Sequence, residues 1–457
     1  MNITTSIESF LGQLAGFLWG LPLVILLVGG GLFFLFYSRF IPYRHLSESL
    51  RLLTRPPDDD EPGQLSHFQA LCTALSGTLG MGNVSGVALA IAMGGPGAIF
   101  WMWVSALLGI ATKFYTCTLA VMYKGKDSEG EWQGGPMYVI REGLGRRWLP
   151  LAYFFALAGL LGTLPIFQIN QLVQVLRDTI AIPAGITAAE EHFTFDLIVG
   201  CVLAIVVLIV GLGKLPRLGR IARIIVPSMV GAYILLTGFV LISHANEVPA
   251  ALGLIISDAF TGNAVAGGVV GAVIITGIRR AAFSNEAGIG TEAMAHGAAR
   301  TKEPVREGLV AMLGPIVDTL IVCTCTALVI LISGVWQSGD ADGATLTATA
   351  FGELFPMGGS VILAVLVSAL GLSTVFTFWY YGSKCLGFLI GAKYQHHYIW
   401  FYMGLVVIGA VVSLQIVVNL IDSMYALMAI PTMTATLLLA PKVNQAAKTY
   451  FAKRESA

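Results

Sequence analysis

The chain has 457 residues, of which 56% are hydrophobic and only 11% are charged, and its formal net charge is zero. A typical soluble protein carries about 25% charged residues, so a chain this apolar lacks the polar side chains to cover a soluble surface. The composition excludes a soluble enzyme, a disordered scaffold and a nucleic-acid-binding protein, and it predicts an all-α integral membrane protein. The 53 glycines indicate close helix packing and interrupted helices.

Apolar runs long enough to cross a bilayer recur along the chain. The first, residues 17–37, has no basic segment before it, whereas Arg39 and Arg44 follow it. A cleavable signal peptide has the reverse arrangement, so we expect a retained transmembrane helix. About 11 transmembrane helices are predicted, over residues 17–37, 66–92, 97–123, 149–181, 195–213, 216–243, 264–299, 305–334, 356–390, 396–417 and 419–440.

The charges of the loops indicate the orientation in the membrane. Alternate loops and the C-terminal tail carry Lys and Arg, whereas the loops between them carry Asp and Glu. Because loops rich in Lys and Arg stay in the cytoplasm, we expect the N-terminus outside and the C-terminus in the cytoplasm. The basic loop residues include Arg51, Arg55, Lys124, Lys126, Arg141, Arg146, Arg147, Lys214, Arg217, Arg300, Lys302, Arg306, Lys442, Lys448 and Lys453.

The order of the spans predicts two halves of opposite orientation. A first helix and a cytoplasmic linker occupy residues 1–65, and five helices over 66–243 then begin inside and end outside. Five more over 264–440 begin outside and end inside, before a cytoplasmic tail at 441–457. This is the pattern of an inverted repeat, in which the substrate binds near the middle of the bilayer between the two repeats.

Each half begins with a helix that contains polar residues and glycines at mid-span. Non-helical backbone at this depth is tolerated only where it lines a cavity or is buried in protein. The alternative is that these glycines only allow close contact between helices. That alternative could explain one such stretch, but it explains two, one at the start of each half, less well. We therefore expect a substrate site between two broken helices, whose free N–H groups suit a carboxylate and whose free C=O groups suit a cation. The residues at the breaks are Thr78, Gly80, Met81, Gly82 and Asn83 in the first half and Ser284, Asn285 and Gly288 in the second.

Charged residues inside the predicted spans are candidates for function, because each is costly there. We expect Glu286 to pair with Arg280 or to cap exposed N–H groups, with direct coordination of a coupling cation as the alternative. For Lys113 and Asp318 we expect roles in packing or pairing. His296 follows the second break, where a hydrogen-bonded core histidine is favoured over a proton relay.

Polar side chains in two further helices have the chemistry of ligands. Gln168 and Asn170 point to different helix faces, so one of them is expected to contact the substrate while the other holds a neighbouring helix. Ser373 and Thr374 offer adjacent hydroxyl oxygens of the type that sodium accepts. The alternative is that these hydroxyls bond the carbonyl one turn earlier in their own helix, as Ser and Thr in helices usually do.

Motifs of other function classes are missing from the sequence. It contains no Walker sequence and no Ser–His–Asp constellation, and Gly80-Met81-Gly82 lies in a span rather than in a β-α-β unit. We therefore expect a protein that is not an enzyme, with no cofactor other than a coupling ion and no obligate protein partner.

Long motifs along the chain have counterparts in a known family. The stretch Phe283-Ser284-Asn285-Glu286-Ala287-Gly288-Ile289-Gly290 is the most specific, and it is accompanied by residues 18–20, 77–88, 94–103, 134–138 and 379–382. In these stretches the chain resembles the alanine or glycine:cation symporter family. The resemblance implies a LeuT-type fold of five plus five helices with one extra N-terminal helix. It also implies sodium- or proton-coupled uptake of a small neutral amino acid.

The resemblance also assigns roles by position. The backbone of residues 80–83 and 284–288 would hold the carboxylate and the amine of the substrate, and Phe283 and Gln168 would line its side-chain pocket. Met81 and Phe378 lie at expected pocket walls, where the family often has Thr and Trp, so we expect the class of small neutral amino acids rather than alanine in particular.

A sodium site follows from the same comparison by position. The hydroxyls of Ser373 and Thr374 would complete it, together with carbonyls of the first broken helix around Ala74 and Gly77. The expected protein is thus a symporter that imports a small neutral amino acid with sodium by alternating access, in a bacterial inner membrane. Proton coupling, a different amino-acid selectivity and a passive channel are the alternatives.

Overall fold

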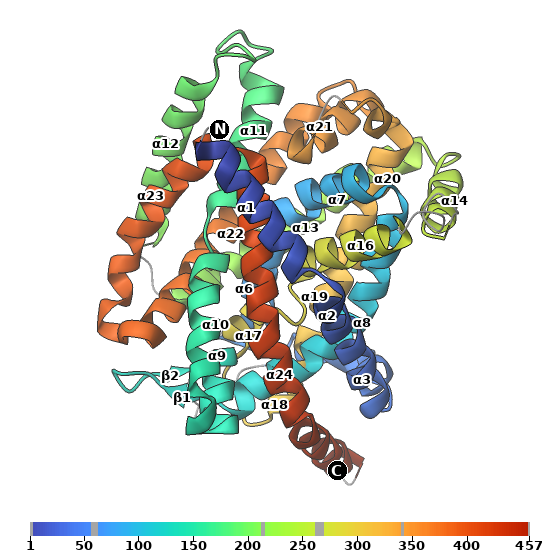
Figure 1. Cartoon of the computed structure of the whole chain (residues 1–457). Coiled ribbons are helices and arrows are strands. Elements are labelled where there is room, and N and C mark those ends of the chain that lie inside the picture. The colour runs from blue at the N-terminus through green and yellow to red at the C-terminus, as the bar shows by residue number, and fades with distance from the viewer. Residues whose placement is uncertain (1–2, 56–62, 212–214, 261–268, 340–341, 456–457) are drawn as a thin grey trace.

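The computed structural model describes residues 3–55, 63–211, 215–260, 269–339 and 342–455. Apart from one hairpin of strands β1 (Gly125–Lys126) and β2 (Trp132–Gln133), the described residues fold into a bundle of helices (Figure 1). The two termini lie at opposite ends of this bundle. Residue 264, where we place the start of the second half, lies outside the described residues, and the division into two repeats stays a prediction.

The first part of the chain supplies helices up to the expected end of the first half. They are α1 (Ile3–Leu18), α2 (Leu21–Val24), α3 (Gly30–Tyr37), α4 (Ile41–Arg44), α5 (Leu46–Leu52), α6 (His67–Thr78), α7 (Met81–Gly94), α8 (Gly97–Met122), α9 (Pro136–Tyr138), α10 (Leu149–Gly162), α11 (Ile166–Leu176), α12 (Phe193–Gly211) and α13 (Leu215–Ser243).

The rest of the chain forms a second set of helices. They are α14 (Val248–Asp258), α16 (Val269–Asn285), α17 (Thr291–His296), α18 (Pro304–Ala311), α19 (Leu313–Pro315), α20 (Thr324–Ser333), α21 (Gly343–Leu354), α22 (Gly359–Ile390), α23 (Tyr398–Val411) and α24 (Leu414–Glu455). In the described part of the chain, four π-helical segments directly continue α2, α9, α11 and α19, and they are η1 (Ile25–Gly29), η2 (Val139–Leu144), η4 (Arg177–Ala181) and η5 (Ile316–Cys323).

The length and composition of the helices fit a multi-pass membrane protein. In the described part of the chain, six helices are long and apolar enough to cross a membrane, or up to eight if each of two bent pairs counts as one span. Outward faces of α12 and α13 carry exposed apolar side chains such as Ile205, Ile209, Leu235 and Ile242, as helices in contact with lipid do. The total of about 11 spans stays a prediction.

The first span differs from the prediction for residues 17–37. Its helix already begins at Ile3, and α1 meets the following helix at an angle of 49°. Gly20 has extended backbone angles at this bend, and Pro22 occupies the first turn of α2. Proline fits the first turn of a helix because its missing N–H has no partner there. The prediction therefore started the helix too late and missed its bend.

The C-terminal helix is longer than predicted. We expected a helix to end at residue 440 and a tail to follow, but α24 continues through Pro441 to Glu455. The extension buries Val443, Ala447 and Tyr450, and Tyr450 donates a hydrogen bond to Glu48 Oε1 at 2.8 Å. Tertiary packing thus outweighs the low helix propensity of proline at this position.

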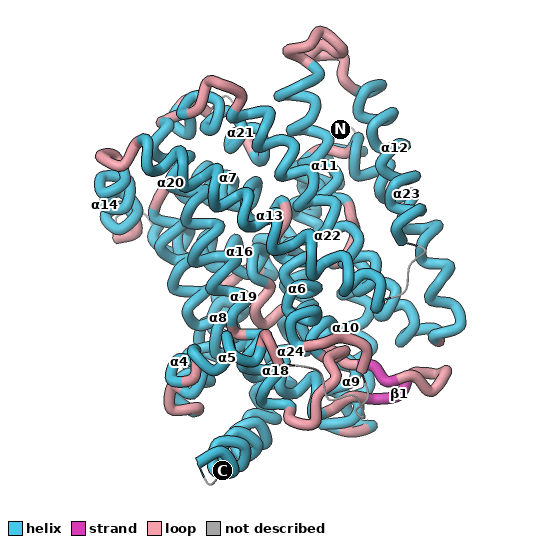
Figure 2. Tube along the Cα trace, turned by 180° about the vertical axis from the view of Figure 1, so that it is seen from behind, coloured by secondary structure: helices cyan, strands magenta, loops and turns pink. Residues whose placement is uncertain are grey.

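The arrangement of the helices separates the two kinds of loop (Figures 1 and 2). The β1–β2 hairpin and α18, beside the basic loops, lie at the C-terminal end of the bundle, whereas α14 and α21, beside the acidic loops, lie at the other end. Helices α12 and α23 pack side by side along one edge. This distribution agrees with the pattern of loop charges on which the predicted orientation rests.

Candidate functional site

The first break lies where the sequence analysis expects it. Helix α6 ends at Thr78, α7 begins at Met81, and the two are bent by 41°. Asn83 closes the new helix end, because its Oδ1 accepts a hydrogen bond from Gly80 N at 3.0 Å. A Cβ at Gly80 would collide with Thr374 Oγ1 and lie 3.0 Å from Gln168 Oε1, so only glycine fits this close approach to α11 and α22.

The second break lies slightly later than predicted. Helix α16 continues through Ser284 and Asn285, and the interruption spans residues 286–290 before α17 begins. Glu286 has a φ of 57°, and Gly288 and Gly290 also have positive φ. Asn285 Oδ1 accepts a hydrogen bond from Ala287 N at 3.0 Å and so stabilises the turn.

The two breaks are in direct contact. Asn83 Nδ2 donates to Ser284 Oγ at 3.2 Å, which joins α7 to the end of α16. The backbone of Gly82 approaches Phe283, since a Cβ at Gly82 would lie 3.4 Å from Phe283 O. The structure thus brings together Gly80, Gly82, Asn83, Phe283 and Ser284.

Two predicted residues have other surroundings. A Cβ at Gly288 would lie 2.9 Å from Leu27 Cδ2 and 3.0 Å from Met433 Sδ, so this glycine packs against η1 and α24 and not against the first break. The hydroxyl of Thr78 is buried without a hydrogen-bond partner among the described residues, at the end of α6.

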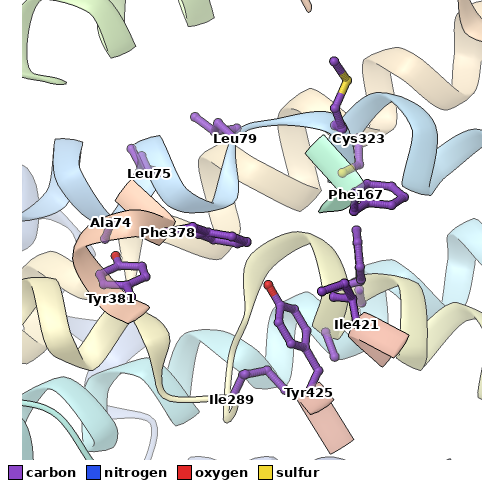
Figure 3. Packing of buried hydrophobic residues seen from close by; sticks show 14 of the residues in the cluster. Ala74, Leu75, Leu79, Phe167, Ile289, Cys323, Phe378, Tyr381, Ile421 and Tyr425 are labelled. Carbon is purple, nitrogen blue, oxygen red and sulfur yellow. The ribbon is translucent and has the colours of Figure 1, made fainter. Parts of the chain in front are cut away.

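Aromatic rings and one methionine surround the breaks. Phe167 meets Phe283 edge to face with ring centroids 4.7 Å apart, and Tyr425 lies on another side of Phe283 at 5.6 Å. Phe378 of α22 points between the two breaks, and the Tyr425 hydroxyl points toward the second (Figure 3). Met81 Cε lies 2.9 Å from the position of a Cβ at Gly371, so Met81 packs against α22. Any ligand here would meet mainly apolar walls.

Gln168 and Asn170 contact different neighbouring helices, and the expected contact of one of them with the substrate stays a prediction. Gln168 Oε1 accepts a hydrogen bond from Met81 N at 2.9 Å and so caps the free end of α7. Asn170 Nδ2 instead donates to Gly409 O at 3.2 Å and Val412 O at 2.7 Å, which ties α11 to α23.

The residues proposed for sodium lie at the contact between α6 and α22. Ser373 Oγ lies 3.4 Å from Ser76 O, and Ser76 Oγ donates to Ser373 O at 3.0 Å. A Cβ at Gly77 would lie 3.3 Å from Thr377, so Gly77 allows the close approach, while Ala74 is buried beside it (Figure 3). This contact brings the carbonyl of Ser76 in α6 next to the hydroxyl of Ser373 in α22.

Both hydroxyls of the pair also bond within their own helix. Ser373 Oγ and Thr374 Oγ1 reach Leu370 O at 2.8 Å and 3.3 Å, as the alternative interpretation expects. A cavity of about 210 Å³ between α13 and α22 reaches Ser76 and Ser373. Sequence reasoning missed Ser76 and Thr377, although hydroxyl residues facing Ser373 are the natural partners of such a site.

The charges beside the second break pair differently from the prediction. Arg280 and Arg279 both contact Asp422 of α24, with Arg279 Nη2 2.5 Å from Asp422 Oδ2. Glu286 accepts hydrogen bonds from Tyr425 at 2.8 Å and from Thr291. The prediction that Arg280 pairs with Glu286 is therefore wrong. The bend at residue 286 turns the glutamate away from α16. Asp422 lies in a predicted span, and the rule for intramembrane charges would have found it.

A buried carboxylate connects α6, before the first break, with α17, after the second. Glu307 of α18 accepts contacts from His296 Nδ1 at 2.6 Å and from His67 Nδ1, and all three side chains are buried. Next to them the backbone of Leu65 forms a strand-like bridge with Ala299. His296 is thus a hydrogen-bonded core histidine in this structure.

Comparison with known proteins places this arrangement in a family. The model of the sodium:alanine symporter family matches residues 4–457. A Methanococcus maripaludis protein named sodium/alanine symporter AgcS is 39% identical over 97% of this chain and 97% of its own length. A Bacillus subtilis protein named probable sodium/glutamine symporter GlnT is 35% identical over 98% of this chain and 92% of its own.

A solved structure confirms the predicted fold type, though not the number of spans. The crystal structure of MhsT in complex with L-phenylalanine matches 80% of this chain and 81% of that one, with a TM-score of 0.53 and 15% sequence identity. The likeness shows a LeuT-type fold. By its sequence over nearly its whole length, the chain belongs to the sodium:alanine symporter family and is a membrane transporter, not an enzyme.

Proposed function

We propose that this protein imports a small neutral amino acid together with sodium, by alternating access across a bacterial inner membrane. The observation that carries the proposal is the contact of two broken helices at Asn83 and Ser284. Such breaks present backbone N–H and C=O groups at membrane depth, the groups that bind a zwitterion and a cation. The names of the relatives agree with this chemistry, since they include a sodium/alanine and a sodium/glutamine symporter.

The enclosure of the breaks supports a small substrate. Phe283, Phe378 and Met81 are buried around them, and bulky side chains at these positions leave little room beyond an amino acid's backbone groups. The carboxylate and amine would lie against residues 80–83 and 284–288. The sodium ion would lie between Ser373, Thr374 and the carbonyls around Ala74 and Gly77. One such ion gains about 2.3 kcal/mol from a membrane potential of 100 mV, in addition to its own gradient.

Uptake into proteoliposomes tests the proposal. Purified protein should accumulate radiolabelled alanine, glycine or serine when an inward sodium gradient is applied. The rate of uptake should saturate as the substrate concentration rises. Replacing sodium by choline should abolish accumulation at constant pH. Accumulation that follows a pH gradient without sodium would instead favour proton coupling. One relative is named putative sodium/proton-dependent alanine carrier protein YrbD, so both ions are worth testing. Uptake that ignores both gradients would indicate a passive facilitator.

A further inference from the structure

The C-terminal extension of α24, residues 441–455, is tied to two earlier helices. Asn444 Nδ2 donates a hydrogen bond to Tyr37 O, at the end of α3, at 2.8 Å. Asn444 Oδ1 accepts a hydrogen bond from the hydroxyl of Tyr115 in α8 at 2.5 Å. Terminal segments are ordered only where contacts of this kind hold them, so the extension is an integral part of the fold.

Glu48 of α5 holds the last turns of this extension. Its side chain is buried, and its carboxylate accepts a hydrogen bond from Tyr450 at 2.8 Å and forms an ion pair with Arg454. His45 Nδ1 lies 3.5 Å from the same carboxylate. Because a carboxylate that is withdrawn from water needs its partners, Glu48 favours the state in which the extension stays docked on α5.

Helix α18 packs against both α5 and the extension. The guanidinium of Arg306 lies 6.0 Å from the centre of the Tyr450 ring. Lys453 Nζ lies 3.7 Å from Glu303 Oε1. Glu303 directly precedes the first turn of α18, and Glu307 lies in that turn. The extension therefore contacts the same turn of α18 that carries Glu307.

Glu307 connects this turn to both broken helices, because its carboxylate contacts His67 of α6 and His296 of α17. These three side chains are buried, whereas the Lys453 side chain at the extension is 68% exposed. A buried pair costs more to break than an exposed one. When α6 and α17 move, we therefore expect α18 to move with them and to separate from the extension.

We propose that the C-terminal extension of α24 positions α18 and thereby holds one end of the transport path closed. This end carries the basic loops, which we predict to face the cytoplasm (Figures 1 and 2). The inference rests on alternating access, which belongs to the proposed function. Tyr450, Arg454 and Lys453 are then positioning residues, since they act on the path through α18 and Glu307. Opening at this end begins with the loss of their contacts.

Labelling of native cysteines in the purified protein tests this role without any transport. Cys72 of α6 is only 1% exposed, and α6 packs against α13, so we expect Cys72 to react when α6 moves away. Tyr450→Phe combined with Arg454→Gln removes two partners of Glu48 and keeps the aromatic ring. In this double variant a maleimide should modify Cys72 about fivefold faster than in the wild type, because the open form gains population.

Two controls separate this role from a general loss of stability. Lys448→Gln removes a positive charge from the exposed face of the same helix, and it should leave the rate at Cys72 unchanged. Cys385 of α22 is buried against Gly159, and it should stay unreactive in every variant. Faster labelling of Cys72 and Cys385 alike would show that the extension only stabilises the fold. That result, or an unchanged rate at Cys72 in the double variant, would overturn the proposal.

A swap of charges tests the contact with α18 by itself. Glu303→Lys places a positive charge beside Lys453 at a partly exposed position, and it should speed the labelling of Cys72 about twofold. Adding Lys453→Glu restores an ion pair and should return the rate to that of the wild type. Failure of this rescue would also contradict the proposal. The labelling needs neither substrate nor gradient, so it decides the role of the extension even if uptake proves independent of sodium.

Discussion

Arg280 of α16 and Asp422 of α24 form an ion pair whose side chains are each only 1% exposed, although 142 positions separate them in the chain. Arg279 contacts the same carboxylate, and Trp19 Nε1 donates to Asp422 O at 2.9 Å. The guanidinium of Arg280 also lies 5.1 Å from the Phe283 ring. One aspartate thus joins the N-terminal helix, the second broken helix and α24 beside the proposed substrate site.

Removing this aspartate should destabilise the fold strongly. Asp422→Asn leaves the buried Arg280 and the partly buried Arg279 without a counter-ion, and breaking a buried pair in this way costs about 3–5 kcal/mol. The unfolding temperature in detergent should therefore fall clearly. Glu142→Gln provides the control, because its pair with Arg141 is partly exposed and such pairs contribute about 0–1 kcal/mol. Equal unfolding temperatures for the two variants would contradict this account of the ion pair.

Glycine at position 80 should be required for transport. In Gly80→Ala the new methyl group collides with Thr374 Oγ1 and approaches Gln168 Oε1, and overpacking of this kind costs about 1–3 kcal/mol. We expect uptake to fall at least tenfold at low sodium. Gly86→Ala is the matched control on the same helix, since its methyl group would meet Phe283 at an ordinary 3.7 Å. Transport that is lost equally in both would mean that only helix flexibility matters.

Gln168 should contribute to the order of the first break. Gln168→Met removes the acceptor for Met81 N and leaves a buried N–H unpaired, at a cost of about 1–3 kcal/mol. The concentration of substrate for half-maximal uptake should rise about tenfold, with a smaller change in protein yield. Gln168→Glu keeps an oxygen at this position and should lose less. Wild-type substrate affinity in Gln168→Met would show that this cap has no role in binding.

Thr374 should affect the cation more than the amino acid. Its hydroxyl lies where α22 meets the first break, so Thr374→Ala should raise the sodium concentration for half-maximal uptake by about tenfold and leave the order of preferred substrates unchanged. Ser368→Ala serves as the control, because Ser368 Oγ bonds only Ala364 O of the same helix among the described residues. Altered substrate preference with normal sodium dependence would reject the assignment.

The sequence predicts the breaks well because their signal is local. Glycines and polar residues at mid-span oppose a continuous helix wherever they occur, so Gly80, Asn83 and Ser284 are found without any knowledge of their neighbours. The partners of buried charges cannot be predicted in this way, because Arg280 meets Asp422 only through the packing of α16 on α24. The same holds for the tail, where buried side chains carry α24 past Pro441 against local propensity.

The carboxylate of Glu307 holds the first turn of α6 through His67 and the last turn of α17 through His296. Together with the backbone bridge at Leu65 and Ala299, it holds α6 and α17 to each other. Because α6 and α17 share this contact, we expect them to move as one unit. The ion and the amino acid should then leave for the cytoplasm in one event. A disulfide between Leu65→Cys and Ala299→Cys should then leave the release of both unchanged, whereas it would block a release that requires the two segments to separate.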